Sequence, residues 1–365
     1  MEIGDFPVGA ACRIDIPTYS RKVAEIAVGL DPEGVAADAN RRRAYVACSR
    51  SDWVTVVDLQ EQKAIAWVPV GKEPIDLVFD VPTDRIFTAD AHADTVSVVD
   101  AETLQLVATV PVGAYPSGLG YDRERRRLYV GNSLGGTMSV IDVDTLETIA
   151  TVEAEIGAGA IEIDRERRIV ICVNFIAASI TFVDQDTNEV IGRLDVGTGA
   201  CAVGVVPERG EAFVVNSVAG TVNRIDVEGM RVVEELRVGE APVGLTIAPA
   251  HDRVYVTNRG AGTISVLGVA DGAEWTQITV GEGPGGVTID PVDGRLLCAD
   301  AGSGTLTIAE DLLAGRPPAP AIEEVSPLVG KPLPAFSLVD LATGEQRSSL
   351  EWAQKRYIIN FFASW

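Results

Sequence analysis

The chain has 365 residues, of which 47% are hydrophobic, and its formal net charge is −23. So acidic a chain disfavours binding to nucleic acid or to an anionic membrane, and it favours solubility. No apolar run is long enough to span a membrane, and the start at Met1–Asp5 lacks the basic and apolar stretches of a signal peptide. Five widely spaced cysteines without a Cys-x-x-Cys pair argue against a disulfide framework or a zinc site.

A period of 42 residues runs through most of the chain. One register of this period is glycine, at Gly29, Gly71, Gly113, Gly197, Gly239 and Gly281. Another register is mostly Asn or Asp, and it reads Cys48, Asp90, Asn132, Asn174, Asn216, Asn258 and Asp300. Several registers that agree over seven copies indicate a repeat architecture, which a single motif match would not.

Each copy contains four short runs rich in Val, Ile and Thr, and turn residues separate the runs. In the second copy these runs are Ile75–Asp80, Arg85–Ala89, Thr95–Val99 and Leu106–Val112. Four strands in a repeat of this length are typical of a propeller blade. The sequence therefore predicts an all-β fold, a seven-bladed β-propeller of four-stranded blades over residues 1–311.

The two ends of the repeat region are expected to share the last blade. Lys22–Val28 fits the fourth strand of that blade, and this pairing would remove an exposed sheet edge. Two segments compete for its third strand. Thr305–Ala309 has the right spacing, whereas Cys12–Ile16 resembles a third strand but is one residue out of register. The spacing favours Thr305–Ala309.

Three runs resemble the YVTN repeat family: Tyr255–Asn258, Thr137–Asp142 and Val110–Gly113. The resemblance covers about residues 10–310 and implies the propeller fold, although propellers host many activities. Members of this family are mostly found outside the cytoplasm. The resemblance therefore implies a periplasmic or cell-surface location, for which this sequence shows no signal peptide.

The C-terminal part has a different character. Residues 312–329 contain the proline-rich stretch Gly315–Pro320 and read as an extended linker. Residues 330–365 resemble the start of a TlpA/redoxin thioredoxin-like domain, on the runs Val329–Asp340 and Tyr357–Trp365. In that family the second run leads into Cys-x-x-Cys. The resemblance implies a thiol–disulfide oxidoreductase domain in a longer product, and the chain as given lacks the thiols for that chemistry.

Departures from the repeat cluster in the first three copies and predict a binding site. Asp76, for example, stands on an inner strand where Gly or Ala is usual. The acidic and aromatic residues expected around one mouth of the propeller are Asp31, Glu33, Trp53, Glu73, Asp76, Asp90, His92, Asp94 and Tyr115. Such a set suits a divalent metal, a small cation or a cationic group of a protein. The alternative is that these are solvated loop carboxylates of an acidic protein.

Two repeated polar features have a structural and a functional interpretation. The Asn/Asp register either forms a polar ring for a ligand or caps its own turns, and its presence in every blade favours capping. On the opposite face, arginine runs either dock a partner protein or are solvated turns, and we prefer solvated turns. The residues of the docking hypothesis are Arg42, Arg43, Arg125, Arg126 and Arg167.

The sequence leaves three functions open. The first is a monomeric binding module for a protein or small molecule, joined in the intact product to the redox domain. The second is a lactonase-like hydrolase, as some seven-bladed relatives are, in which Asp76, Asp90 and His92 carry metal or acid–base chemistry. The third is a non-catalytic cell-surface scaffold. No Ser–His–Asp pattern is visible.

Overall fold

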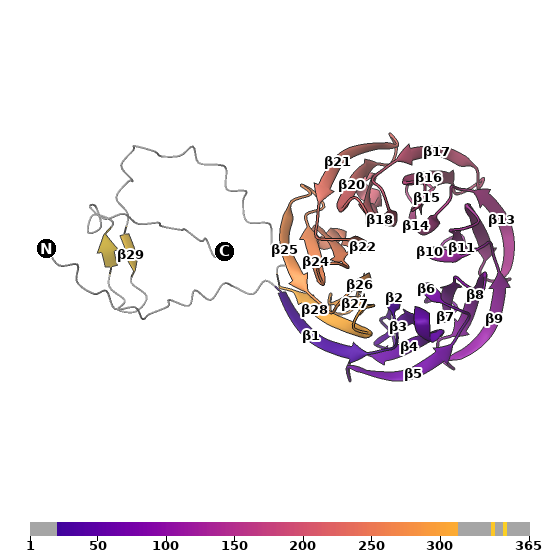
Figure 1. The fold of residues 1–365 in the computed structure, drawn as a ribbon, viewed down its shortest axis with the longest axis horizontal. Helices are drawn as coiled ribbons and strands as arrows, with labels where there is room; N and C mark the ends of the chain where they lie inside the picture. The colour runs from indigo at the N-terminus through magenta and orange to yellow at the C-terminus, as the bar shows by residue number, and fades with distance from the viewer. Residues whose placement is uncertain (1–19, 313–336, 340–345, 349–365) are drawn as a thin grey trace. The chain divides into compact units, whose positions relative to one another are not determined.

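The computed structural model describes residues 20–312, 337–339 and 346–348. The chain forms two compact units, residues 1–316 and 317–365. The first unit is a ring of seven four-stranded antiparallel sheets (Figure 1). The fold is thus an all-β, seven-bladed propeller, which confirms the prediction. Among the described residues the only helices are three single 3₁₀ turns, η1 (Ser49–Ser51), η2 (Pro207–Arg209) and η3 (Pro249–His251).

The first six blades each take four consecutive strands, from the inner strand next to the ring axis to the outer strand at the rim (Figure 1). Blades 1 to 3 comprise β2 (Pro32–Asp38), β3 (Arg43–Cys48), β4 (Trp53–Asp58) and β5 (Lys63–Pro69); β6 (Pro74–Asp80), β7 (Arg85–Asp90), β8 (Thr95–Asp100) and β9 (Gln105–Pro111); and β10 (Pro116–Asp122), β11 (Arg127–Asn132), β12 (Thr137–Asp142) and β13 (Glu147–Glu153).

Blades 4 to 7 follow the same plan. They comprise β14 (Ala158–Asp164), β15 (Ile169–Asn174), β16 (Ser179–Asp184) and β17 (Val190–Asp195); β18 (Ala200–Val206), β19 (Glu211–Asn216), β20 (Thr221–Asp226) and β21 (Arg231–Arg237); β22 (Pro242–Ala248), β23 (Arg253–Asn258), β24 (Thr263–Leu267) and β25 (Glu274–Thr279); and β26 (Pro284–Ile289), β27 (Leu296–Asp300), β28 (Thr305–Asp311) and β1 (Ser20–Ala27).

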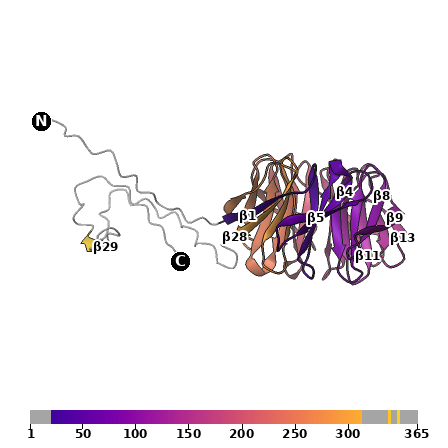
Figure 2. The same ribbon diagram turned by 90° about the horizontal axis from the view of Figure 1, so that it is seen from below.

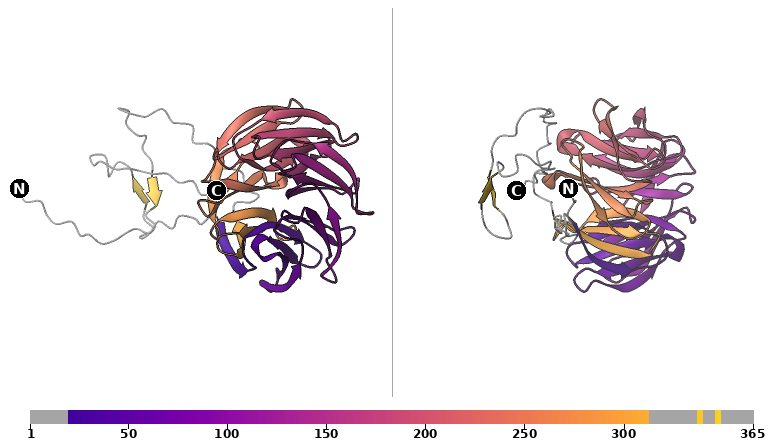
Figure 3. Two further views of the ribbon diagram at one scale, coloured as in Figure 1. Left: turned by 45° about the vertical axis from the view of Figure 1, so that its right-hand side comes forward. Right: turned by 60° about the vertical axis from the view of Figure 1, so that its left-hand side comes forward.

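The seventh blade joins the two ends of the ring. Its strand order is β26-β27-β28-β1, and β1 pairs antiparallel with β28 from Ser20 opposite Asp311 to Ala27 opposite Thr305. The indigo β1 lies beside the orange β28 in Figure 3. The third strand is therefore the segment that the repeat spacing favoured. The competing segment at residues 12–16 lies outside the described residues.

The hydrophobic core lies between blades rather than within a single sheet. One cluster, for example, joins Tyr45 and Val56 of blade 1 to Phe79 and Ile86 of blade 2, and the rings of Tyr45 and Phe79 are 5.3 Å apart. Viewed from its edge, the ring shows the sheets standing side by side around the axis (Figure 2). Because each sheet buries its faces against its neighbours, blades depend on one another for stability.

The turns between third and fourth strands show why aspartate recurs there. The Oδ1 atom of Asp142 accepts hydrogen bonds from the backbone N–H groups of Asp144 and Thr145, at 3.0 and 2.9 Å. Asp184 makes the same pair of contacts in the next blade. An aspartate that caps its own turn in this way satisfies backbone donors that no strand partner reaches.

In the second unit the structure describes one short hairpin, in which β29 (Ser337–Val339) pairs antiparallel with β30 (Gln346–Ser348). Most of the expected linker at residues 312–329 and of the thioredoxin-like segment at residues 330–365 lies outside the described residues. Within the part that is described, no helix has the length and apolarity needed to cross a membrane.

Candidate functional site

The seven inner strands surround a central channel with a volume of about 730 Å³. Most of its wall is Gly, Ala, Val, Leu and Ile, because small and apolar side chains fit where seven strands converge. The charged exceptions in the wall are Glu33, Asp76, Arg123, Glu162 and Arg165. All five belong to blades 1 to 4, so the charge of the channel lies on one side of the ring.

Asp76 is a half-buried carboxylate on inner strand β6. Its Oδ1 accepts a hydrogen bond from the N–H of Leu77 at 2.8 Å, and its Oδ2 accepts one from the N–H of Leu119 in the next blade at 2.9 Å. Burial raises the pKa of Asp76 to about 6, although these two hydrogen bonds oppose the rise. Within the described residues it has no ion-pair partner, so its charge in the channel is not neutralised by a cation.

Glu162 on β14 is a second channel carboxylate, and the sequence analysis missed it. Its side chain is exposed to the channel, while the surrounding wall raises its pKa to about 7. The nearby Arg165 lowers this pKa, and the charge of Asp76 raises it further. Asp76 has the lower pKa and ionises first, so Glu162 must ionise next to an existing negative charge.

The repeat itself distinguishes Glu162, because this residue carries a charge at a position that is uncharged in every other blade. The same position in the other blades holds only small or uncharged residues: Ala36, Val78, Gly120, Gly204, Thr246 and Thr288. Glu162 is therefore the same kind of departure as Asp76. Glu162 lies further along its inner strand than Asp76, at the fifth residue of β14 rather than the third residue of β6.

Four predicted residues come together in the loops at one mouth of the channel. The hydroxyl of Tyr115 donates to Oε1 of Glu73 at 3.3 Å, and Nδ1 of His92 contacts Oε2 of the same carboxylate. The rings of His92 and Tyr115 meet edge to face, with centroids 5.4 Å apart. Asp94 accepts a hydrogen bond from the backbone N–H of Tyr115 at 2.8 Å. An acidic and aromatic cluster thus exists here, built from blades 2 and 3.

The remaining predicted residues of this mouth have other contacts. Glu33 forms an ion pair with Arg259 of blade 6, so a cation already offsets its charge. The hydroxyl of Ser49 donates to the carbonyl of Asp31 at 3.1 Å and is 3.4 Å from its carboxylate. The indole N–H of Trp53 donates to the Thr55 hydroxyl at 3.1 Å. No contact among the described residues joins these three to the cluster of Glu73.

The fold and the sequence also match known proteins. A profile of the YNCE-like β-propeller family matches residues 13–205 and 193–293 of the chain. The chain belongs to this family. Among solved structures, Kuenenia stuttgartiensis hydrazine synthase is similar with a TM-score of 0.69 and 19% sequence identity, over 83% of this chain and 98% of that chain. Identity this low supports the fold alone. No curated protein matches the chain.

In this YNCE-like propeller, Asp90 cannot serve a ligand in the way the sequence analysis expected. Its side chain is fully buried and accepts hydrogen bonds from the hydroxyls of Thr88 and Ser97, at 2.7 and 2.6 Å. Asn132 occupies the equivalent place in blade 3, where its amide donates to Thr137 and Ser139 at 3.1 and 3.0 Å. Both side chains tie the strands of their own blade together through hydroxyl groups, which is a structural role but not the capping of their own turn that was expected.

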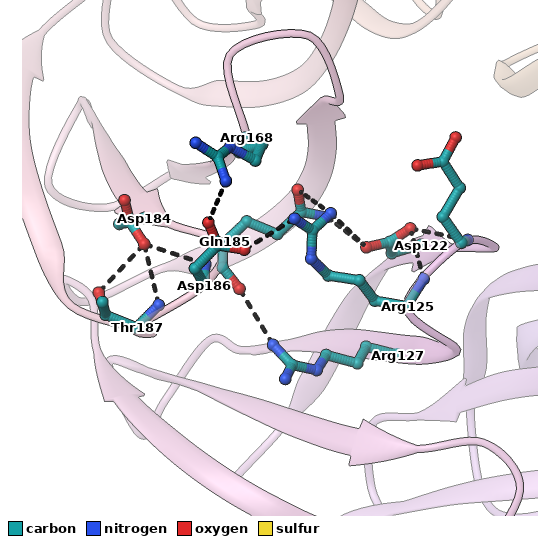
Figure 4. A network of polar contacts seen from close by, with 9 residues as sticks. Asp122, Arg125, Arg127, Arg168, Asp184, Gln185, Asp186 and Thr187 are labelled. Carbon is teal, nitrogen blue, oxygen red and sulfur yellow. Dashed lines mark hydrogen bonds and ion pairs between the residues drawn. The ribbon is translucent and has the colours of Figure 1, made fainter.

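The arginine runs on the opposite face of the YNCE-like propeller are engaged within the protein. Arg125 donates to Gln185 at 2.9 Å and to Asp186 at 2.7 Å in the next blade (Figure 4). Arg126 contacts Asp80 of the preceding blade at 2.9 Å. The remaining residues of the docking hypothesis are bound likewise: Arg42 to Asp290 and Asp293, Arg43 to the carbonyl of Ala101, and Arg167 to Asp164 and the carbonyl of Pro207. We therefore do not propose docking through these five side chains.

An arginine in fact bridges every junction between neighbouring blades. In ring order from the junction of blades 7 and 1, the bridging residues are Arg42, Arg41, Arg126, Arg125, Arg167, Arg224 and Arg253. The sequence analysis interpreted Arg42, Arg125, Arg126 and Arg167 as solvated turns or docking charges, and it did not consider Arg224 or Arg253. Their partners lie in other blades, so no local pattern in the sequence reveals the pairing.

The described residues contain no group of three or more His, Cys, Asp or Glu side chains arranged to hold a metal ion. Among the described carboxylates, the imidazole of His92 contacts that of Glu73 alone, and the carboxylate of Asp76 accepts hydrogen bonds from two backbone N–H groups. This arrangement is better suited to an organic cation, which needs a counter-charge and enclosure rather than a fixed set of ligands.

Proposed function

We propose that this propeller is a binding module whose central channel takes up a small organic cation. The observation that supports it is the pair of carboxylates, Asp76 and Glu162, in a channel of about 730 Å³ without an ion-pair partner among the described residues. Enclosing unpaired carboxylates is unfavourable unless a cation offsets them. The pKa values of Asp76 and Glu162 are raised to about 6 and about 7, because the channel wall disfavours their charged forms.

The loop cluster of Glu73, His92 and Tyr115 fits the rim of such a site. Glu73 adds negative charge at the mouth, and the half-buried ring of Tyr115 offers a face with which an entering cation can interact. An acidic body with a net charge of −23 further attracts cations toward the mouth.

Isothermal titration calorimetry with pentylamine tests this proposal. We expect binding at pH 8 and affinity at least about fivefold weaker at pH 5.5, because both channel carboxylates are then largely protonated. The double variant Asp76→Asn with Glu162→Gln should lose the binding. Glu102→Gln, an exposed carboxylate outside the channel, is the matched control and should leave it unchanged.

Two outcomes would count against the proposal. Pentylamine that binds the double variant as well as the native protein would place the cation elsewhere. Calcium or zinc that binds with higher affinity than the amine, and loses that affinity in the double variant, would make the site a metal site despite the sparse set of ligands.

The hydrolase alternative has less support. It requires Asp76, Asp90 and His92 to act together, and Asp90 is sealed within its blade by the hydroxyls of Thr88 and Ser97. A lactonase screen with added divalent metals still distinguishes the two functions, because the binding module predicts no turnover.

We further propose that a longer gene product joins this module to a thiol–disulfide oxidoreductase. The support is the similarity of residues 330–365 to the start of TlpA/redoxin domains. Reading the coding sequence beyond Trp365 tests this, since the proposal requires Cys-x-x-Cys directly afterwards.

A further inference from the structure

Two arginines in the channel wall have no hydrogen-bond or ion-pair partner among the residues that the structure describes. Arg123 follows inner strand β10 and Arg165 follows inner strand β14, so they stand in adjacent blades. Both side chains are exposed, and no hydrogen bond or ion pair joins either to another described residue. The other arginines of the same turns, such as Arg126 and Arg167, all donate to neighbours. Because the neighbouring arginines are all bound within the protein, the guanidinium groups of Arg123 and Arg165 are the ones available to a ligand.

The position of these arginines is also a departure from the repeat. The equivalent residues in the other blades are Ala39, Val81, Pro207, Pro249 and Pro291. Only blades 3 and 4 therefore bring positive charge to this end of the channel. The planar guanidinium group of arginine can donate two parallel hydrogen bonds to one carboxylate. Two arginines from adjacent blades therefore suit the binding of one anionic group.

The arginines lie close to the proposed cation site. Arg165 comes three residues after Glu162 along the same chain segment, in the turn that directly follows β14. The positive charge of Arg165 influences Glu162, since it lowers the pKa of that carboxyl. An anion bound at the arginines alone would be repelled by the carboxylates of Asp76 and Glu162. A ligand that carries both a positive and a negative group can instead form a favourable contact with the carboxylates and with the arginines.

We propose that the ligand of this channel is a zwitterion whose ammonium group lies at Asp76 and Glu162 and whose carboxylate lies at Arg123 and Arg165. This inference rests on the proposed cation site and adds the chemical class of the ligand. Because the two opposite charges belong to different residues of the channel wall, an ω-amino acid with several carbons between amine and carboxylate suits them better than an α-amino acid.

Calorimetry of the full chain at pH 8 with 5-aminopentanoate, pentylamine and pentanoate tests the inference. We expect 5-aminopentanoate to bind about tenfold more tightly than pentylamine, the gain typical of charge-assisted hydrogen bonds. The double variant Arg123→Gln with Arg165→Gln should abolish the difference in affinity between 5-aminopentanoate and pentylamine, because neither arginine is then available to the carboxylate.

The matched control is Arg237→Gln, an exposed arginine on the outer strand β21 that lies away from the channel and has no side-chain hydrogen bond or ion pair with another described residue. It should change none of the affinities. Since Arg123 and Arg165 support no contact in the described fold, the double variant should retain the native far-ultraviolet circular dichroism and thermal midpoint. Lysine at both positions keeps the positive charge but cannot donate the paired hydrogen bonds of a guanidinium. Its affinity for 5-aminopentanoate should therefore lie between that of the native protein and that of the glutamine variant.

The outcomes separate the two proposals. Pentylamine that binds while 5-aminopentanoate binds no more tightly overturns the zwitterion and leaves the cation site standing. Pentanoate that binds as tightly as 5-aminopentanoate also overturns it, because the ammonium would then contribute nothing. If none of the amines binds, the cation site fails and the inference fails with it.

Discussion

At the scale of single residues, the exceptions to the repeat define the chemistry of the channel. Asp76 and Glu162 replace Gly, Ala or other uncharged residues on inner strands, where most of the wall is apolar. Residues that obey the repeat, such as Asp90 and Asn132, are buried and hydrogen-bonded within their blades. A polar residue repeated in each blade serves the blade, and a polar residue found once is free to serve a ligand.

The raised pKa of Glu162, from its ordinary value of 4.5 to about 7, has a measurable consequence for stability. Between these values the folded protein retains a proton that the unfolded chain has lost, so the contribution of this group is present below pH 4.5 and disappears as the pH rises through 7. Glu162→Gln mimics the protonated form. Relative to the native protein it should be unchanged at pH 4 and more stable by about 1 kcal/mol at pH 8, a value reduced for screening by channel water.

Urea unfolding at a series of pH values measures this difference. Glu166→Gln, an exposed carboxylate in the following turn that does not line the channel, is the control and should show no such trend. Equal pH profiles for Glu162→Gln and the native protein would contradict the prediction, since Glu162 would then ionise as it does in water.

At the scale of strands and turns, long-range arginine contacts connect the blades. The turn between β10 and β11 supplies two of these bridges, because Arg126 reaches back to Asp80 and Arg125 reaches forward to Asp186. Asp80 is fully buried and also accepts a hydrogen bond from the Tyr121 hydroxyl at 2.7 Å. These hydrogen bonds and the positive charge of Arg126 outweigh the desolvation of Asp80 and lower the pKa of its carboxyl.

Removing one bridge should therefore loosen one junction. We expect Arg126→Gln to destabilise the propeller by about 2 kcal/mol, because it leaves the buried Asp80 without its cation. The matched control is Arg123→Gln in the same turn, which should stay within about 0.5 kcal/mol of the native protein because Arg123 has no partner there. Chemical unfolding monitored by fluorescence compares the two, and equal losses would refute the assignment of Arg126 as a bridge.

At the scale of the whole molecule, stability depends on the closure of the ring by strands from opposite ends of the repeat region. Blade 7 takes three strands from residues 284–311 and its fourth from β1. Ile26 of β1 packs in one cluster with Leu306 and Ile308 of β28, and Val46 of blade 1 belongs to the same cluster. Opening this blade would expose both a sheet edge and the hydrophobic surface beneath it.

A disulfide across the closure tests this role. Ala27 lies opposite Thr305 in the strand pair, so Ala27→Cys combined with Thr305→Cys places two thiols at neighbouring positions. The oxidised form should be more stable than its own reduced form by about 2–4 kcal/mol, because the crosslink restricts opening of the ring. Thermal unfolding of both forms measures the difference. Burial raises the pKa of the Cys48 and Cys172 thiols, which limits mispairing.

An oxidised protein with a verified crosslink and an unchanged thermal midpoint would show that closure does not limit stability.

The sequence by itself determined the propeller, its blade count and the pairing expected at its closure. These follow from a 42-residue period and alternating strands, which are local patterns repeated seven times. It also located Asp76 and the cluster of Glu73, His92 and Tyr115, because both interrupt the repeat.

Only the tertiary structure decided which charges are available to a ligand. Arg125 and Arg123 are two residues apart in one turn. The first is bound to Asp186 in the next blade, whereas the second lines the channel without an ion-pair partner among the described residues. The charge of Asp76 raises the pKa of Glu162 although the two residues are 86 positions apart. Such pairings depend on the curvature of the ring, which brings distant segments together at its axis and at its junctions, and no local pattern records that geometry.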